Sequence, residues 1–375
     1  MDFNFTEEQV QFADAIKRWI ARDYSFEARR AIIQSPAGVS EAAWATLAEL
    51  GMTALPIPQA QGGFDGSALD MFVVMRELGR GLVVEPYFAT VLGAEFLKLG
   101  GGHGLLLQRV AAGELKLACA LGERQSRHDM TSIETRAERV DGGYLIRGEK
   151  KVVLHGAQAG ALIVTAHAPE GITVFVVAAD APGVHIVQYR TLDGRRAANI
   201  RFDGVQVAAN AVVGAPGAGG DVLDAALDYG AGLLCFDALG AMEALFEDTL
   251  GYLKTRQQFG VPIGTFQALQ HRMADMYIHL EQARSMVLLA AARLGSPDPQ
   301  ERRRAISAAK FRIGQAARFV GQQAVQLYGG MGVTDELPAA HYFKRLTFFE
   351  LTLGDSDHHL ARFIAQPGFA QAEVA

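Results

Sequence analysis

The sequence has little of what marks secreted, nucleic-acid-binding or membrane-spanning proteins. It contains only two cysteines in 375 residues, Cys119 and Cys235, which excludes a disulfide framework and fits a reducing compartment. Its 35 lysines and arginines are outnumbered by 41 aspartates and glutamates, which argues against a nucleic-acid binder. No run approaches the roughly 20 apolar residues of a membrane span, and the first residues lack the pattern of a signal peptide. We therefore expect a cytoplasmic protein without a membrane span.

What is present is enough apolar sequence for two or three folded units, since half of the residues are hydrophobic. Apolar periodicity favours helices in residues 1–114, and Thr6 and Gln9 have the spacing of a capping box. Residues 115–225 change to short β-rich runs, and residues 226–375 return to long helical stretches.

Within the middle region, the run from Ser132 to Val140 favours a strand, and Asp141-Gly142-Gly143 is a hairpin signal. The sequence therefore predicts an α+β, mostly α fold with three domains. They are an N-terminal helical domain (1–114), a middle antiparallel β domain (115–225) and a C-terminal helical bundle (226–375).

Two segments in the last third carry the strongest functional signal. Residues 256–267 read R-Q-Q-F-G-V-P-I-G-T-F-Q, and residues 326–332 read Q-L-Y-G-G-M-G. Together they offer a permanent cation, several amide side chains and an open glycine backbone. An arginine fork matches phosphate, and glycine lets the backbone approach a ligand closely. This combination suits an anionic, planar, hydrogen-bonding ligand such as a dinucleotide.

In this order the segments resemble the signatures R-x-x-F-G-x-x-I-x-x-F-Q and Q-x-x-G-G-x-G of the acyl-CoA dehydrogenase family of flavoproteins. The chain is most similar to the small-subunit type of pimeloyl-CoA dehydrogenase and related two-subunit enzymes. The resemblance implies FAD as cofactor, an acyl-CoA substrate and an electron-accepting protein such as an electron-transfer flavoprotein. It also implies a tetramer built around a C-terminal four-helix bundle, with each flavin shared between two subunits.

The resemblance assigns the pyrophosphate and adenosine end of the flavin to the C-terminal region. The implied contacts are Arg256, Gln258, Phe259, Gln267, Gln326, Gly329 and Gly330. Simpler interpretations stay open for the same residues. Arg256 would also suit a surface ion pair, the two glycines a helix cap, and Phe259 and Phe266 an ordinary core.

The isoalloxazine end is less complete. Leu121 and Gly122 stand where the family has a Thr-Glu-Pro-Gly type segment, so Gly122 takes the place of the hydroxyl residue. Val152 to Leu154 stand where the family has Trp-Ile-Thr, so the aromatic platform and the second hydroxyl are absent. The backbone of Leu121, Gly122 and Leu154 remains to bind the ring, and His155 is a further donor unless it is structural.

The catalytic base of the family is a glutamate at one of two points, and this sequence has glutamate at neither. The matching residues are Gly354 or Leu353 at one point and Gly230 at the other. Asp355 is the nearest substitute, although its other interpretation is a turn residue. We expect no metal site at Asp355, His358 and His359, because adjacent histidines point different ways on a helix.

Three functional hypotheses follow. The chain is an active homo-oligomeric acyl-CoA dehydrogenase that uses Asp355, a non-catalytic partner of a related catalytic subunit, or a flavin oxidase on the same fold. The motifs that would serve a neighbour's flavin are intact, whereas those that would serve the chain's own flavin have lost their side chains. This asymmetry favours the heteromeric hypothesis.

Overall fold

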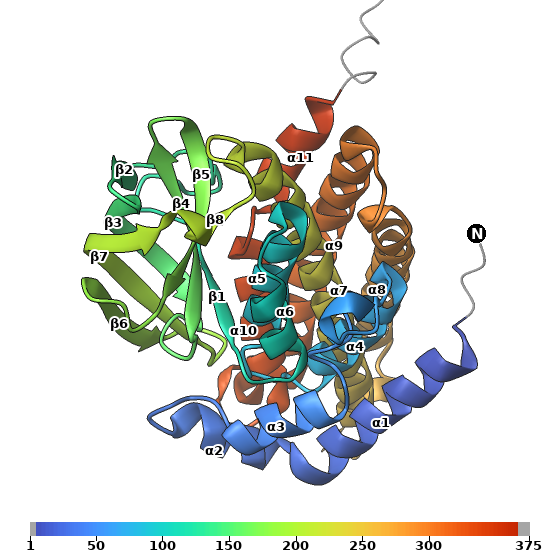
Figure 1. Ribbon diagram of the computed structural model, residues 1–375. Coiled ribbons are helices and arrows are strands. Elements are labelled where there is room, and N and C mark those ends of the chain that lie inside the picture. Colours follow the sequence, from blue (N-terminus) through green and yellow to red (C-terminus); the bar gives the residue numbers. More distant parts are fainter. Residues whose placement is uncertain (1–4, 367–375) are drawn as a thin grey trace, which may run out of the picture. The chain divides into compact units, whose positions relative to one another are not determined.

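Along the sequence the chain forms helices, then strands, then helices (Figure 1), which confirms the predicted order. The computed structural model describes residues 5–366. Backbone contacts divide the chain into two compact units. We call them the helical unit, made of residues 5–29, 68–83 and 231–366, and the sheet unit, made of residues 30–67 and 84–230.

The first part of the chain is helical, as predicted. Its helices are α1 (Glu7–Asp23), α2 (Phe26–Gln34), α3 (Glu41–Glu49), the short 3-10 helix η1 (Gln59–Gln61), α4 (Ala68–Arg80), α5 (Tyr87–Gly100) and α6 (Gly104–Ala111). The predicted capping box opens α1, since Thr6 Oγ1 accepts from the Gln9 amide at 3.2 Å and Gln9 Oε1 accepts from the Thr6 amide at 3.0 Å. Periodicity did not reveal α2 and α6, because helices of nine and eight residues give few periodic repeats.

The middle of the chain forms one sheet with strand order β6-β7-β3-β2-β4-β5-β8, in which β1 pairs with β4. Its elements are β1 (Leu117–Ala120), β2 (Arg136–Val140), β3 (Gly143–Leu154), β4 (Ala161–Ala168), β5 (Gly171–Ala178), β6 (Val184–Arg190), β7 (Arg196–Ala208), η2 (Ala209–Ala211) and β8 (Val212–Val213). The sheet is mixed rather than purely antiparallel, because β1 and β2 both pair in parallel with β4. Such pairing joins strands distant in sequence, which a local pattern does not reveal.

The strand predicted from Ser132 begins only at Arg136. Several backbone groups before it bond to side chains. The Ser132 carbonyl accepts from Gln125 Nε2 at 3.1 Å, and the Glu134 amide donates to Glu123 Oε2 at 2.7 Å. The hairpin itself is confirmed by the pairing of β2 with β3.

The core of the sheet unit lies on the inward face of these strands. On β3, Tyr144 and Ile146 are buried and pack with Phe175, Ile200 and Phe202, whereas Arg147 and Glu149 on the other face are exposed. The rings of Tyr144 and Phe175 meet edge to face at 5.1 Å between centroids. This alternation is that of a sheet with one buried face.

The C-terminal region supplies most of the helical unit. Its elements are α7 (Gly219–Thr255), β9 (Gln257–Gln258), β10 (Val261–Pro262), η3 (Ile263–Thr265), α8 (Gln267–Leu294), α9 (Pro299–Tyr328), η4 (Gly329–Val333), α10 (Pro338–Leu351) and α11 (Ser356–Ile364). The helix α9 contacts α8, α10 and α11 and so forms the centre of the bundle.

Two glycines let α4 approach α7 within this unit. A Cβ atom at Gly79 would lie 2.0 Å from the Asp237 carbonyl oxygen, and one at Gly240 would lie 1.9 Å from that of Arg76. Both positions therefore require glycine for close backbone packing. In residues 5–366, no helix combines the length and apolar character needed to cross a membrane.

Candidate cofactor-binding site

The first motif forms a tight hairpin directly after α7. Gln258 pairs with Val261 and Gln257 with Pro262, so Phe259 and Gly260 make a two-residue loop. Both loop residues have positive φ, 55° and 78°. This is the backbone of a type I′ turn, for which glycine is well suited.

The hairpin presents its polar side chains to solvent. Arg256, Gln258 and Gln267 are all exposed. Within residues 5–366, the Arg256 guanidinium has no hydrogen bond or ion pair, so the surface ion pair considered from the sequence does not form there. The side-chain amide of Gln258 donates through Nε2 only to the neighbouring Gln257 carbonyl, at 2.9 Å. These groups are therefore available to a ligand.

The aromatic residues of this motif do not form a core. Phe259 is 91% exposed and Phe266 is 38% exposed, which contradicts their interpretation as ordinary core. The two rings contact each other edge to face at 6.0 Å between centroids. Such exposure of a large apolar side chain is typical of a binding or assembly surface.

The second motif ends α9. Gly329 has φ 62° and caps the helix, with its amide bonded to the Gln326 carbonyl, so the helix-cap interpretation is correct. Gly329 and Gly330 are exposed, and a Cβ atom at either position would meet nothing within 4 Å. The backbone here is therefore open to close approach, and the Gln326 side chain beside it is exposed.

Two contacts bring the motifs to the same end of the helical unit. The rings of Tyr252 near the end of α7 and Tyr328 at the end of α9 stack at 4.3 Å with 22° between their planes. Arg272 Nη1 of α8 donates to Gln323 Oε1 of α9 at 2.5 Å. A free guanidinium, exposed amides and an open glycine backbone are thus gathered where three helices begin or end.

In the sheet unit, the predicted ring-binding residues lie on two adjoining segments. Gly122 follows β1, and its carbonyl accepts from the Lys151 amide of β3 at 2.8 Å. The pairing of β3 with β7 is irregular between Lys150 and Val153, and Val152 has φ 53° and is 54% exposed. Leu154 closes β3 and is half-buried. We call Leu121 and Gly122 together with residues 152–154 the ring edge.

A buried ion pair that the sequence reasoning missed lies beneath the ring edge. Lys150 Nζ donates to Glu123 Oε1 at 2.7 Å, to the Leu121 carbonyl at 3.1 Å and to Thr165 Oγ1 at 3.0 Å. Burial raises the pKa of Glu123, but hydrogen bonds from Gln125 and Lys150 and the Lys150 charge outweigh it and lower the pKa to about 2. The alternation of side chains between the two faces of a strand could have revealed this pair, because it places Lys150 on the inward face of β3.

His155, weighed as a further donor, follows the ring edge with φ 55°. Its side chain is buried, with 2% of its surface exposed. Burial on this scale fits the structural interpretation of the histidine.

The region of the predicted base is a fixed linker between α10 and α11. Asp355 caps α11, with its Oδ1 accepting from the His358 amide at 2.8 Å. Lys310 of α9 is fully buried and donates to the Phe349 carbonyl at 3.0 Å and the Gly354 carbonyl at 2.7 Å. A Cβ atom at Gly354 would lie 2.6 Å from ring atoms of both His358 and His359, so no side chain fits there.

The neighbouring histidine is held neutral. Burial lowers the pKa of His359 to about 2, with the charge of Lys310 acting in the same direction. Its Nε2 donates to the Leu353 carbonyl at 2.8 Å. Among the described residues, no group of three or more histidine, cysteine, aspartate or glutamate side chains is arranged to hold a metal ion.

Three family models match consecutive parts of the chain. They are the acyl-CoA dehydrogenase N-terminal domain over residues 6–103, the middle domain over residues 118–205 and the C-terminal domain over residues 217–366. The chain belongs to the acyl-CoA dehydrogenase family.

Relatives in this family are distant in sequence but similar over their whole length. The mitochondrial 2-methylacyl-CoA dehydrogenase of Solanum tuberosum is 29% identical, over 84% of this chain and 79% of its own. The ChsE4-ChsE5 complex from Mycobacterium tuberculosis contains a chain with a TM-score of 0.88 and 27% identity, with both chains fully covered. PigA with FAD and proline has a TM-score of 0.90 and 25% identity, covering 99% of this chain and 100% of that one.

The two regions fit the flavin of an acyl-CoA dehydrogenase to different degrees. The hairpin end of the helical unit fits a pyrophosphate, because Arg256 presents an unpaired fork of donors. The ring edge offers backbone groups at Gly122 and Leu154 but no hydroxyl or aromatic side chain from Gly122, Val152 or Leu154. The adenosine-diphosphate end of the family's cofactor is therefore the better matched.

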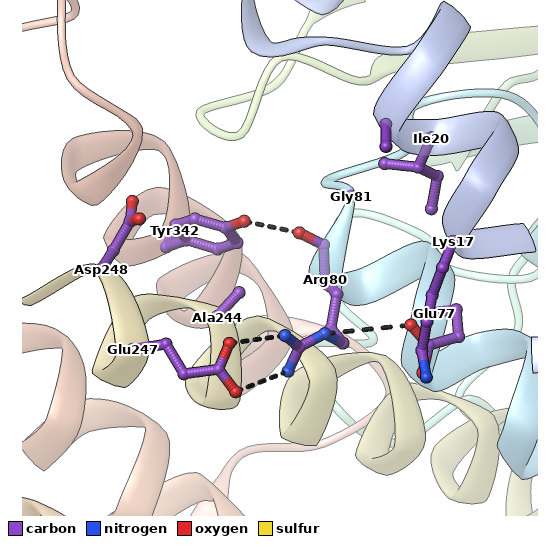
Figure 2. A pocket seen from close by; sticks show the side chains of 10 residues that line it. Lys17, Ile20, Glu77, Arg80, Gly81, Ala244, Glu247, Asp248 and Tyr342 are labelled. Atoms are coloured by element: carbon purple, nitrogen blue, oxygen red, sulfur yellow. Dashed lines mark hydrogen bonds and ion pairs between the residues drawn. The ribbon is translucent and has the colours of Figure 1, made fainter. Parts of the chain in front are cut away.

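A cleft elsewhere in the helical unit contains none of the predicted site residues (Figure 2). It has a volume of about 400 Å³ and is lined by α1, α4, α7 and α10. Arg80 is held within the cleft, since its Nη2 lies 2.6 Å from Glu247 Oε2 and its carbonyl accepts from the Tyr342 hydroxyl at 2.5 Å. Burial raises the pKa of Glu77, which lies at the same cleft. This cleft is not part of the candidate flavin site.

Proposed function

We propose that this chain is the non-catalytic partner subunit of a heteromeric, FAD-dependent acyl-CoA dehydrogenase. The observation that carries the proposal is the contrast between an exposed, unpaired Arg256 and a ring edge without side-chain donors. A phosphate-binding end without its own ring-binding end suits a flavin whose ring rests on another subunit. The heteromeric ChsE4-ChsE5 complex among the relatives supports an assembly of this kind.

The chain's own residues would hold the anionic end of the cofactor. Arg256 would pair with the pyrophosphate, and the open backbone at Gly330 with the Gln326 amide would receive the adenosine side. Phe259 at the tip of the hairpin would pack against the neighbouring subunit. When bound, the flavin supplies the acceptor for a hydride from the β carbon of an acyl-CoA thioester.

The α10–α11 linker supports a non-catalytic role. The reaction needs a carboxylate that removes the proton α to the thioester carbonyl. No side chain fits at Gly354, and Asp355 uses its carboxylate to cap α11. We therefore assign the base to the partner subunit, which in this proposal also holds the ring and the acyl-CoA, within a tetramer that passes electrons to an electron-transfer flavoprotein.

Flavin stoichiometry tests the proposal. The chain expressed alone should be poor in FAD and should not oxidise acyl-CoA esters with an artificial electron acceptor. Co-expressed with its catalytic partner, it should form an α2β2 assembly with two flavins per four chains. Absorbance of the released flavin and the mass of the assembly give both numbers. A homotetramer with one FAD per chain and robust turnover would refute the proposal.

A further inference from the structure

The ion pair beneath the ring edge is costly to bury and so needs a reason. The side chains of Lys150 and Glu123 are 0% and 3% exposed. Moving two charges out of water costs several kcal/mol each, and an apolar pair of similar volume is often no less stable. The neighbouring core of the sheet unit, in contrast, consists of apolar and aromatic side chains.

What the pair holds is the backbone of the ring edge rather than the sheet as a whole. Lys150 Nζ ties the Leu121 carbonyl to β3 at 3.1 Å. Glu123 accepts from the amides of Glu134 at 2.7 Å and Thr135 at 3.2 Å, which closes the segment between β1 and β2. The next carbonyl, that of Gly122, accepts from the Lys151 amide. The contacts at Leu121 and Gly122 fix backbone groups of the ring edge itself, and those of Glu123 hold the adjoining segment before β2.

We propose that Lys150 and Glu123 are positioning residues that keep the ring edge in the shape of a flavin cradle although its side-chain donors are gone. This inference rests on the proposed function, because it takes the ring edge to be the remnant of the chain's own isoalloxazine site. In addition, we infer that the ring edge has lost only the side chains that bind the flavin ring. Its backbone keeps the same shape because Lys150 and Glu123 hold it.

The space around the ring edge agrees with a loss of side chains only. A Cβ atom at Gly122 would lie 3.5 Å from the Lys151 carbonyl and 3.9 Å from Met130 Sδ, which are ordinary contacts. Val152 projects from the irregular part of β3 and is 54% exposed, so a larger side chain has room there. Hydroxyl or aromatic residues at these positions would fit the backbone without moving it.

Hydrogen exchange tests the positioning role without any flavin. In Lys150→Met, the exchange of the Glu134, Thr135 and Lys151 amides should accelerate at least tenfold more than the exchange of the amides of β5. Glu123→Gln, which keeps the side-chain shape and breaks the same pair from its other side, should give the same pattern. Arg139→Met is the matched control, since it breaks an exposed ion pair with Glu170 on the same sheet. Uniform acceleration across the sheet, or none, would overturn the inference.

Flavin uptake tests the link to the ring. If the chain alone lacks flavin, Gly122→Thr with Leu154→Thr should raise FAD per chain several-fold, and adding Lys150→Met should abolish the gain. If the wild-type chain binds FAD, the proposed function fails, and Lys150→Met should then lower FAD content and shift the visible spectrum of the bound flavin in the wild-type background. Arg139→Met should change neither the FAD content nor the spectrum of the bound flavin.

Two outcomes would overturn the positioning role. One is full FAD content with Lys150→Met in either background, and the other is no gain in FAD from the two threonines.

Discussion

The hairpin end of the helical unit and the ring edge of the sheet unit differ in where their polar side chains lie. At the hairpin end the polar side chains point to solvent, and the Arg256 fork has no partner within residues 5–366. At the ring edge the surface side chains are apolar or absent, and the polar side chains Lys150 and Glu123 lie buried beneath. One region exposes groups that are available to a ligand, and the other buries groups that hold its own backbone.

This difference separates side chains that are available to bind a ligand from side chains that hold the backbone in shape. A charged side chain left exposed and unpaired contributes little to folding and stays available to a ligand or partner. A buried ion pair with five further backbone or side-chain partners maintains local shape. The ring edge has lost ligand-binding side chains but has kept the ion pair that holds its backbone. A subunit would show this combination if its neighbour carried the catalytic site.

The largest expected effect concerns support at the ring edge. Glu123→Gln should lower the free energy of unfolding by roughly 3–5 kcal/mol, because it leaves the Lys150 ammonium buried without a counter-charge. Urea unfolding followed by circular dichroism measures the change. Glu138→Gln, at an exposed position on β2, is the control and should stay within about 0.5 kcal/mol of the wild type.

The same carboxylate predicts an acid-sensitive fold. The pKa of Glu123 is about 2 in the folded chain and lies near its ordinary value of 4.5 when unfolded. A depressed folded pKa contributes stability above the unfolded value, and this contribution is lost as pH falls from about 4.5 towards 2. Glu123→Gln should therefore flatten the pH dependence of unfolding in this range. An unchanged slope would show that the carboxylate is not held by the buried pair.

The next effect concerns recognition at the hairpin. Arg256→Ala should weaken FAD binding to the heteromeric assembly ten- to hundredfold, on the order of 1.5–3 kcal/mol for a charge-assisted contact. Arg256→Lys should restore only part of the affinity, because lysine lacks the planar fork. Fluorescence titration of the apo-assembly with FAD measures it, and Lys254→Ala is the control for charge at a nearby exposed position. Equal affinity in all variants would remove Arg256 from the site.

A smaller effect is expected for the exposed aromatic at the hairpin tip. Phe259→Ser should change the free energy of unfolding of the isolated chain by no more than about 0.5 kcal/mol, because the ring is 91% exposed. It should nevertheless loosen the assembly, which sedimentation at falling concentration detects. Destabilisation of the isolated chain instead would mean that the ring packs within its own subunit.

The smallest effect is expected at Asp355. Asp355→Asn should leave turnover of the assembly within about twofold, because asparagine caps a helix as well as aspartate does. Loss of a true catalytic base would cost about 10²–10⁴ in rate. A loss on that scale, with FAD content intact, would return Asp355 to the active site and defeat the contrast between the two regions.

Much of the fold could be read from local patterns. Long apolar-periodic stretches located α7, α8 and α9, and the Thr6 and Gln9 capping box located the start of α1. The short helices α2 and α6 were missed, and the parallel pairing of β1 with β4 was not anticipated. Strand partners depend on contacts between residues far apart in the chain, which no local window contains.

The candidate site divides in the same way. The sequence by itself determined the two glycine-containing motifs, the Arg256 cation and the absence of glutamate at the family's base positions, because residue identity and spacing are local facts. Only the tertiary structure decided that Arg256 is unpaired, that Asp355 caps α11 and that Lys150 supports the ring edge from below. Those roles depend on which groups a side chain meets after folding, and the same lysine or aspartate would serve equally well on a solvated surface.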